Sequence, residues 1–346
     1  MAASTARSGL WRALLRIALA ALLLGLAFRL AIPQDERSIP EALAAAWSAP
    51  LSEALAWFAL AFVVFGANFL AAAWRFTALL RGAGLVFSTA GVLRAYIVAS
   101  FFGLVLPSNL AGDVYRFAEA RRDSGRGAEV LGVLAIERLL GLAALGSVAL
   151  VGAPFVVLPA DRAADEGWVR GALVSATGGI AVVTMAALHP LGRRIFDRCI
   201  QLLRRVSSRF AQVASRSLEA IGDLSRQPRL VARAFFLSLV CQGLPVLAVL
   251  ILAVPLDTTL GWPWFAVVVP FVTAVSLLPI SVGGAGVRES LYVALFGAVG
   301  MRSEVALSLS LSTFAASLLW GLVGLALFSA GRRRAEAQED SGPSSR

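Results

Sequence analysis

Residues 106–116 read Leu-Pro-Ser-Asn-Leu-Ala-Gly-Asp-Val-Tyr-Arg, and residues 278–288 read Leu-Pro-Ile-Ser-Val-Gly-Gly-Ala-Gly-Val-Arg. Aligned on Leu-Pro, each copy has a glycine five residues after the proline (Gly112, Gly284) and an arginine nine residues after it (Arg116, Arg288). Proline stops a helix, and glycine permits a sharp reversal. Because both copies adjoin apolar runs, each is interpreted as a broken helix with a charged residue just beyond the break. Membrane transporters place binding sites at such breaks.

A chance match between two ordinary loops remains the alternative to this repeat. The composition nevertheless places the chain in a membrane: of 346 residues, 58% are hydrophobic and 15% charged, whereas a soluble protein carries about 25% charged residues. Several apolar runs reach the ~20 residues that cross a bilayer as a helix. We therefore expect an all-α, polytopic membrane helix bundle with roughly six to eight spans plus two broken or re-entrant hairpins, arranged as an inverted repeat.

The charged and sulfur-containing residues narrow the partners. The net charge is +10 and every basic residue is arginine, which suits the anionic head groups of a lipid bilayer. Nucleic acid is not expected as a partner, because the charges lie beside membrane spans and not on a soluble basic module. The two cysteines, Cys199 and Cys241, and the single histidine, His189, argue against a disulfide framework or a Cys/His metal cluster. No metal or other cofactor is predicted.

The order of apolar and charged segments divides the chain into four parts. Residues 1–189 form a first membrane half with a hairpin near 90–120, residues 190–226 a basic amphipathic cytoplasmic linker, residues 227–330 a second half with a hairpin near 263–300, and residues 331–346 a disordered cytoplasmic tail. Full spans are predicted up to residue 32 and at 52–73, 130–158, 167–188, 231–254 and 305–330. The span at 52–73 ends at Trp74-Arg75, interpreted as a membrane interface.

The distribution of arginines predicts the orientation. By the positive-inside rule both termini lie in the cytoplasm, the first hairpin opens from the cytoplasm and the second from the outside. The two breaks would then meet near the middle of the bilayer, as in carriers built from inverted repeats.

Charged groups inside apolar segments are the candidates for binding, because they are unfavourable there and are usually functional or paired. The predicted substrate-binding residues are Ser108, Asn109, Gly112, Asp113, Arg116, Glu137, Arg138, Ser281, Gly283, Gly284, Arg288 and Glu289. The arginines present planar forks that match phosphate oxygens, and the glycines of the second copy would add backbone donors at a helix start. The acids would balance the arginines in the empty state or carry a coupled proton. Alternatively, these groups only pair with one another and hold the hairpins in place.

No catalytic residue is predicted, since Gly-x-Ser-x-Gly, His-Glu-x-x-His and the nucleotide-binding loop ending in Lys are all missing from the sequence. An enzyme is therefore the less favoured class, and transport would run downhill or be coupled to an ion.

The motifs resemble those of a known family. Residues 101–116 read Phe-Phe-Gly-x-x-Leu-Pro-Ser-Asn-x-x-Gly-Asp-x-x-Arg, residues 137–141 read Glu-Arg-x-x-Gly, and residues 278–289 read Leu-Pro-Ile-Ser-x-Gly-Gly-x-Gly-x-Arg-Glu. This pattern is similar to the lysylphosphatidylglycerol synthase transmembrane region family, whose members are flippase-like integral proteins. Some members carry a soluble aminoacyl-transfer domain, for which this sequence has no room. The resemblance therefore implies the translocase-like part alone, in a bacterial cytoplasmic (inner) membrane.

The hypothesis is a flippase-like carrier that moves an anionic phospholipid or a polyprenyl-phosphate-linked lipid between leaflets. Two alternatives stay open: a membrane transferase acting on a lipid-linked donor, with Asp113 or Glu137 as its base, and an accessory subunit of a cell-envelope glycosyltransferase. The sequence also leaves open the lipid, the direction of transport, and whether the chain forms a homodimer or binds a glycosyltransferase.

Overall fold

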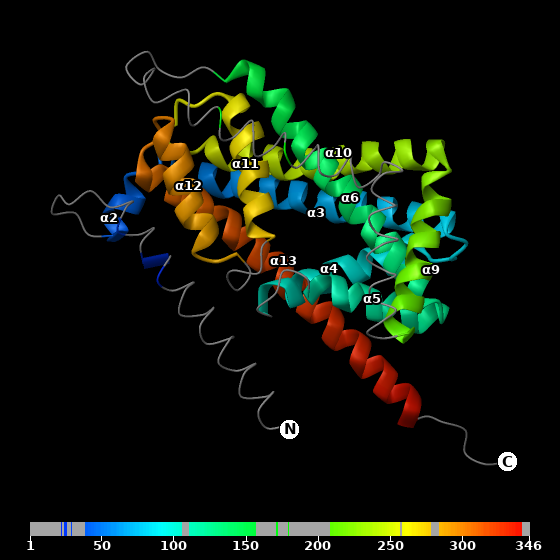
Figure 1. Cartoon of the computed structure of the whole chain (residues 1–346). Coiled ribbons are helices and arrows are strands. Elements are labelled where there is room, and N and C mark those ends of the chain that lie inside the picture. Colours follow the sequence, from blue (N-terminus) through cyan, green and yellow to red (C-terminus); the bar gives the residue numbers. More distant parts are fainter. Residues whose placement is uncertain are drawn as a thin grey trace.

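The structure is a computed structural model, and it describes residues 39–105, 111–156, 208–256, 258–277 and 284–340, with isolated positions at 22, 24, 25, 29, 171 and 179. The helices in these ranges are α2 (Ile39–Ala44), α3 (Leu51–Gly82), α4 (Thr89–Val105), α5 (Ala111–Ser124), α6 (Gly127–Gly152), α9 (Ser208–Ser225), α10 (Pro228–Ala253), α11 (Trp262–Ser276), α12 (Val287–Ala298) and α13 (Ser303–Asp340), with a 3-10 helix η1 (Ala153–Phe155) after α6. Figure 1 shows this helical bundle, which confirms the all-α prediction. The spans predicted up to residue 32 and at 167–188 lie outside the described residues.

Among the described residues, four helices are long and apolar enough to cross a bilayer: α3, α6 with η1, α10 and α13. The most apolar part of α6 is 56% buried inside the protein, against 17% for α3 and 22% for α13. The helix α6 is therefore central, while α3 and α13 present broad apolar faces to the surrounding lipid. The chain is a multi-pass membrane protein.

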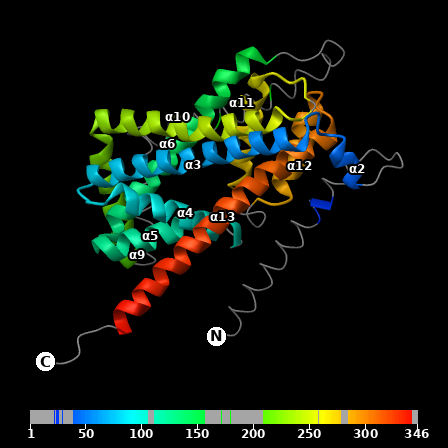
Figure 2. The same cartoon turned by 180° about the vertical axis from the view of Figure 1, so that it is seen from behind.

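Two pairs of shorter helices lie on either side of the two Leu-Pro stretches. The pair α4–α5 flanks residues 106–110 and the pair α11–α12 flanks residues 278–283, and both of these stretches lie outside the described residues. Within each pair the two helices pack against each other, and both pairs also contact α6 and α13. In both views the pairs lie towards opposite ends of α3 and α10 (Figures 1 and 2). This is the placement that an inverted repeat predicts, while entry from opposite faces of the membrane stays a prediction.

The helix α9 covers the described part of the predicted linker and packs against α6. The Oγ atom of Ser217 donates a hydrogen bond to the carbonyl of Ala128 at 2.9 Å. A Cβ atom at Gly132 would lie 2.7 Å from the carbonyl oxygen of Ser217, so only glycine allows this approach. Leu224 is fully buried. The apolar side of these turns therefore faces protein, and contact of the linker with lipid stays a prediction for its earlier residues.

The last helix differs from the predicted tail. Helix α13 continues to Asp340, so the prediction of a disordered segment from residue 331 is wrong for its first ten residues. Arginine, alanine, glutamate and glutamine predominate between residues 332 and 339, and all four are strong helix formers.

Buried apolar side chains form two cores at the two ends of the long helices. One core contains Phe265 and Phe296 with neighbours from α10 and α13. The other contains Phe76, Ile136 and Leu224 with neighbours from α4 and α10. A third, smaller apolar cluster contains Ala71, Ala72 and Cys241.

Candidate functional site

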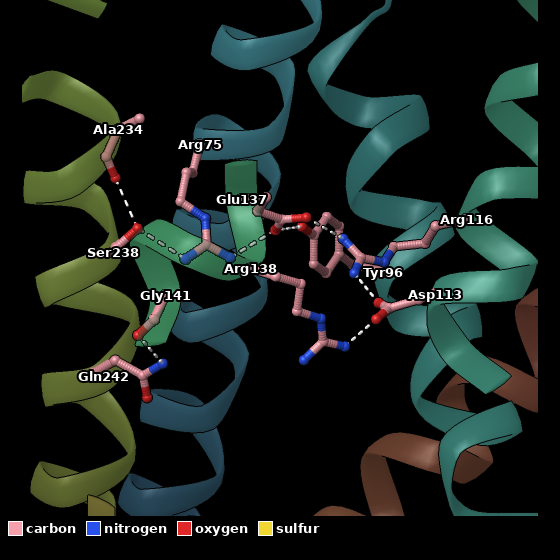
Figure 3. A network of polar contacts seen from close by, with 10 residues as sticks. All are labelled: Arg75, Tyr96, Asp113, Arg116, Glu137, Arg138, Gly141, Ala234, Ser238 and Gln242. Carbon is pink, nitrogen blue, oxygen red and sulfur yellow. Dashed lines mark hydrogen bonds and ion pairs between the residues drawn. The ribbon is translucent and has the colours of Figure 1, made fainter. Parts of the chain in front are cut away.

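Charged side chains from α3, α5 and α6 form a cluster (Figure 3). Its centre is Glu137, whose side chain is only 3% exposed. The Nη2 atom of Arg75 lies 2.6 Å from one carboxylate oxygen of Glu137, and the Nη1 atom of Arg116 lies 3.0 Å from the other. One carboxylate on α6 thus binds a guanidinium from α3 and a second from α5, which joins the three helices.

Two polar side chains extend this cluster to α4 and α10. The hydroxyl of Tyr96 on α4 donates a hydrogen bond to Glu137, and the Tyr96 ring lies 4.2 Å from the Cζ atom of Arg116 in a cation–π contact. On α10, the Oγ atom of Ser238 accepts a hydrogen bond from Arg75 at 3.1 Å. The same Ser238 hydroxyl donates to the carbonyl of Ala234 at 2.8 Å. The network around Glu137 and Arg75 therefore joins five helices: α3, α4, α5, α6 and α10.

The remaining members are Asp113 on α5 and Arg138 on α6. Asp113 forms ion pairs with both Arg116 and Arg138. The side chain of Arg138 is 39% exposed, so it is the most accessible cation of the group. The five charged members are three arginines and two acids, which leaves an excess of one positive charge in the cluster.

A cavity of about 310 Å³ borders this cluster. Its wall includes Arg116, Glu137 and Arg138, the polar side chains Asn68 and Gln242, and Thr273 and Leu277 from the end of α11. Leu277 directly precedes the second Leu-Pro stretch. The cavity therefore lies between the first helix pair and the end of α11, the first helix of the second pair.

Two polar atoms beside the cavity are unsatisfied. The Oδ1 atom of Asn68 and the Nε atom of Arg75 are buried and have no hydrogen-bond partner among the described residues. An unpaired buried polar group is destabilising by about 1–3 kcal/mol. These atoms, together with the accessible guanidinium of Arg138, mark the cavity as a site for a polar ligand.

The depth of the cluster follows from the helix geometry. Glu137 lies ten residues after Gly127, the start of α6, and Ser238 lies ten residues after Pro228, the start of α10. At ~1.5 Å per residue, both are ~15 Å from the start of their helix, about half of a ~30 Å hydrocarbon layer. Charge at this depth is tolerated only when it is paired or meets an ionic ligand. The excess positive charge suits an anion, and a guanidinium matches phosphate oxygens through paired hydrogen bonds.

The predicted residues on α12 form a separate group. The Nη2 atom of Arg288 lies 2.7 Å from the buried carboxylate of Glu289, and its Cζ atom lies 5.1 Å from the centre of the Phe314 ring. The backbone N–H of Gly286 donates to Glu289 at 2.6 Å. Within the parts of the chain that the structure describes, Arg288 and Glu289 make no contact with the cluster around Glu137. The predicted meeting of Arg116 and Arg288 at one ligand is therefore not seen in these residues.

The predicted glycines that the structure describes allow particular backbone conformations and close helix contacts. Gly284 and Gly286 have φ angles of 78° and 81°, which only glycine adopts readily, and they form the turn into α12. The donor of Gly286 is already used by Glu289. A Cβ atom on Gly112 would lie 2.8 Å from the carbonyl oxygen of Ala99, so Gly112 allows α5 to approach α4. The predicted residues Ser108, Asn109, Ser281 and Gly283 lie outside the described residues.

Sequence reasoning missed Arg75, Tyr96 and Ser238. The prediction that Trp74-Arg75 ends a span at the membrane interface is wrong, because α3 continues to Gly82 and Arg75 is buried. Asn68 and Arg75 are seven residues apart, about two helical turns, which places them on one face of a helix. Two polar residues on one face of an apolar run were the signal that could have identified Arg75.

Metal binding has no support in the described ranges, where no group of three or more His, Cys, Asp or Glu side chains lies close enough to hold an ion.

The charged cluster and both Leu-Pro stretches fall within the part of the chain that matches a known family. The family model described as lysylphosphatidylglycerol synthase TM region matches residues 13–326. A search of curated proteins found no match. The family match covers nearly the whole chain, and the protein therefore belongs to the lysylphosphatidylglycerol synthase TM region family.

Proposed function

We propose that this protein is a flippase-like carrier that moves a lipid with an anionic head group between the leaflets of the bacterial cytoplasmic membrane. Membership of the family makes it a membrane protein of lipid metabolism or transport. The finer proposal rests on one observation: the cluster around Glu137 has one more cation than anion and borders a cavity between the two helix pairs.

The ion pairs suit reversible binding of an anion. Without a ligand, Asp113 pairs with both Arg116 and Arg138. An incoming phosphate takes the place of Asp113 on the more accessible Arg138 and adds the missing negative charge. When the phosphate leaves, Asp113 pairs with Arg138 again, so no cation is left unpaired in the apolar region.

The same ion pairs argue for a carrier over a transferase. Proton abstraction requires a carboxylate within hydrogen-bond reach of the substrate. Glu137 already binds two guanidiniums and the Tyr96 hydroxyl, and Asp113 binds two guanidiniums. Both carboxylates are thus engaged in balancing charge.

The proposed orientation follows from the arginines. The end of α3 and the starts of α6 and α10 lie together, because Gln227 donates to the carbonyl of Gly82 at 3.1 Å and Arg126 donates to that of Gly84 at 3.3 Å. Arg81, Arg121, Arg122, Arg126, Arg226 and Arg229 lie in or next to these segments. By the positive-inside rule this end faces the cytoplasm, and the head group enters the cavity from that side.

The test is a leaflet-resolved assay in proteoliposomes that contain phosphatidylglycerol with a fluorophore on one acyl chain. An impermeant reductant added outside destroys the outer-leaflet fluorophores, and further decay reports lipid arriving from the inner leaflet. We expect wild-type protein to accelerate this decay and Arg138→Gln to lower the rate at least about tenfold, since a hydrogen bond to a charged group contributes roughly 1.5–3 kcal/mol.

The matched control is Arg126→Gln, because Arg126 pairs with Glu129 at an exposed position outside the cluster. This variant should transport like wild type, and labelled phosphatidylcholine should not be moved. Equal decay with and without protein contradicts the proposal. Appearance of a lipid with a modified head group would instead favour the transferase.

A further inference from the structure

We propose that a second cavity, beside the charged one, binds the hydrocarbon chain of the same ligand, so that the site holds an amphiphile by both ends. This inference rests on the proposed function, which places the head group at the charged cluster. The second cavity has a volume of about 290 Å³ and lies between α3, α4 and α13. Its wall contains Phe65, Phe69, Leu104 and Trp320.

The two cavities share part of their walls. Asn68 and Phe69, which are adjacent on α3, line both the charged cavity and the second one. The Oδ1 atom of Asn68 is buried without a partner among the residues that the structure describes. This acceptor lies where the charged region gives way to the apolar one. A hydroxyl in the segment that links a head group to its chain would satisfy it.

The second cavity is apolar in effect, although two serines line it. The Ser100 hydroxyl donates to the carbonyl of Ile97 at 2.7 Å, and the Ser317 hydroxyl donates to that of Thr313 at 2.9 Å. Both donors are thus used within their own helices. Besides Asn68 and these two serines, the wall consists of Phe65, Phe69, Gly103, Leu104 and Trp320. Hydrocarbon is the better occupant.

The aromatic wall of the second cavity is preformed. The Trp320 ring stacks on Phe62 with 4.7 Å between ring centres, and its Nε1–H donates to the Phe62 carbonyl at 3.0 Å. A Cβ atom at Gly66 would lie 2.5 Å from the Trp320 ring. Glycine at position 66 therefore lets α3 approach the indole, which is fixed before any ligand arrives. A preformed wall of this kind lowers the entropy lost on binding.

The cavity also borders the lipid-facing surface. Leu70, Val105 and Leu318 are exposed apolar residues, and each directly follows a residue of the cavity wall. An acyl or isoprenoid chain held here would therefore continue into the bilayer while its head group lies at Arg138.

The test fills the second cavity. Gly103 lines it, and a Cβ atom at this position would meet no atom within 4 Å. The variant Gly103→Leu therefore places its Cβ atom in open space and its larger side chain in the cavity wall. Its control is Gly243→Leu: Gly243 is also a partly exposed helical glycine with open space around it, and it lines neither of these two cavities.

The probe is phosphatidylglycerol with a diazirine midway along one acyl chain, added to purified protein in detergent and photolysed. Mass spectrometry maps the labelled peptides.

In wild type we expect label on the segments that line the second cavity, residues 65–69, 97–105 and 313–324. In Gly103→Leu we expect about tenfold less label, the loss expected when roughly two methylene groups are no longer buried. Gly243→Leu should match wild type. Equal labelling of these segments in Gly103→Leu and Gly243→Leu, or wild-type label elsewhere, overturns the chain site.

Photolabelling of Arg138→Gln distinguishes failure of the chain site from failure of the proposed head-group site. Loss of label in Arg138→Gln with normal label in Gly103→Leu supports the charged head-group site and overturns the chain site. Loss in Gly103→Leu alone supports the chain site and overturns the charged cavity as the head-group site. A wild-type protein that takes no label overturns both.

Discussion

Neighbouring residues on α6 have different tasks. Glu137 is buried and saturated by Arg75, Arg116 and Tyr96, whereas the next residue, Arg138, is partly exposed and pairs with Asp113. Consecutive helical residues point about 100° apart, so one turns into the protein and the other towards α5 and the cavity. We infer that Glu137 holds the helices together and that Arg138 meets the ligand.

Replacing Glu137 tests the first of these roles. Glu137→Gln leaves the guanidiniums of Arg75 and Arg116 without their central anion, and breaking a buried ion pair in this way is destabilising by about 3–5 kcal/mol. We expect a clearly lower melting temperature for the purified protein in detergent. Glu129→Gln, on the same helix, is the control, because the pair Arg126–Glu129 is exposed and contributes about 0–1 kcal/mol. Similar melting temperatures for the two variants would show that Glu137 is not a structural centre.

The two helix pairs show that aligned residues need not have the same role. Gly112 and Gly284 occupy the same position in the repeated pattern. In the structure Gly112 is helical and contacts Ala99, whereas Gly284 forms a turn with a positive φ angle. The helices α4 and α11 end just before the two Leu-Pro stretches, as expected because proline stops a helix locally. The pattern did not predict the use of each glycine, which depends on what packs against it.

Two glycine-to-alanine substitutions, at positions 112 and 103, test the contact between α4 and α5. Gly112→Ala puts a methyl group 2.8 Å from the carbonyl oxygen of Ala99, and forcing the helices apart is destabilising by about 1–3 kcal/mol. Gly103→Ala places the same methyl group on α4 in open space and should stabilise by about 0.5–1 kcal/mol, because alanine is the better helix former. We therefore expect melting temperatures that shift in opposite directions. Equal shifts would mean that α5 does not rely on a glycine to approach α4.

The sequence predicted the helices better than the site. The spans expected at 52–73, 130–158, 231–254 and 305–330 correspond to α3, α6 with η1, α10 and α13, because apolar runs of this length have one favourable structure in a bilayer. Asp113, Arg116, Glu137 and Arg138 form ion pairs with one another, as the alternative stated from the sequence proposed, and their binding of a ligand stays a prediction. Arg75 was assigned to the membrane interface, because its partner Glu137 is 62 residues away and only tertiary packing brings the two together.

At the scale of the whole molecule, the charged cluster adjoins one of the two large apolar cores. The helices α6 and α13 each contact both helix pairs, so they connect the two pairs. A carrier needs such a centre, with cores that stay closed on either side while the site is exposed to one face at a time. The cluster, about halfway along α6, suits this position.

The inverted arrangement makes a prediction about accessibility. The loop before α4 contains Val86, which is 93% exposed, and the loop before α11 contains Thr259, which is also exposed. If the two helix pairs enter from opposite faces, these loops lie on opposite sides of the membrane. We expect Thr259→Cys to react with an impermeant maleimide on intact cells, and Val86→Cys to react only after the membrane is permeabilised.

Both variants are made in a background with Cys199→Ser and Cys241→Ala, since these are the two native cysteines and Cys241 is buried beside Arg75. The cysteine-free parent must remain unlabelled and keep its transport rate, so that any label reports only the introduced thiol. Reaction of both thiols on intact cells, or of neither, would place the two loops on one side. The helix pairs would then be parallel repeats, and the inverted arrangement predicted from the sequence would be wrong.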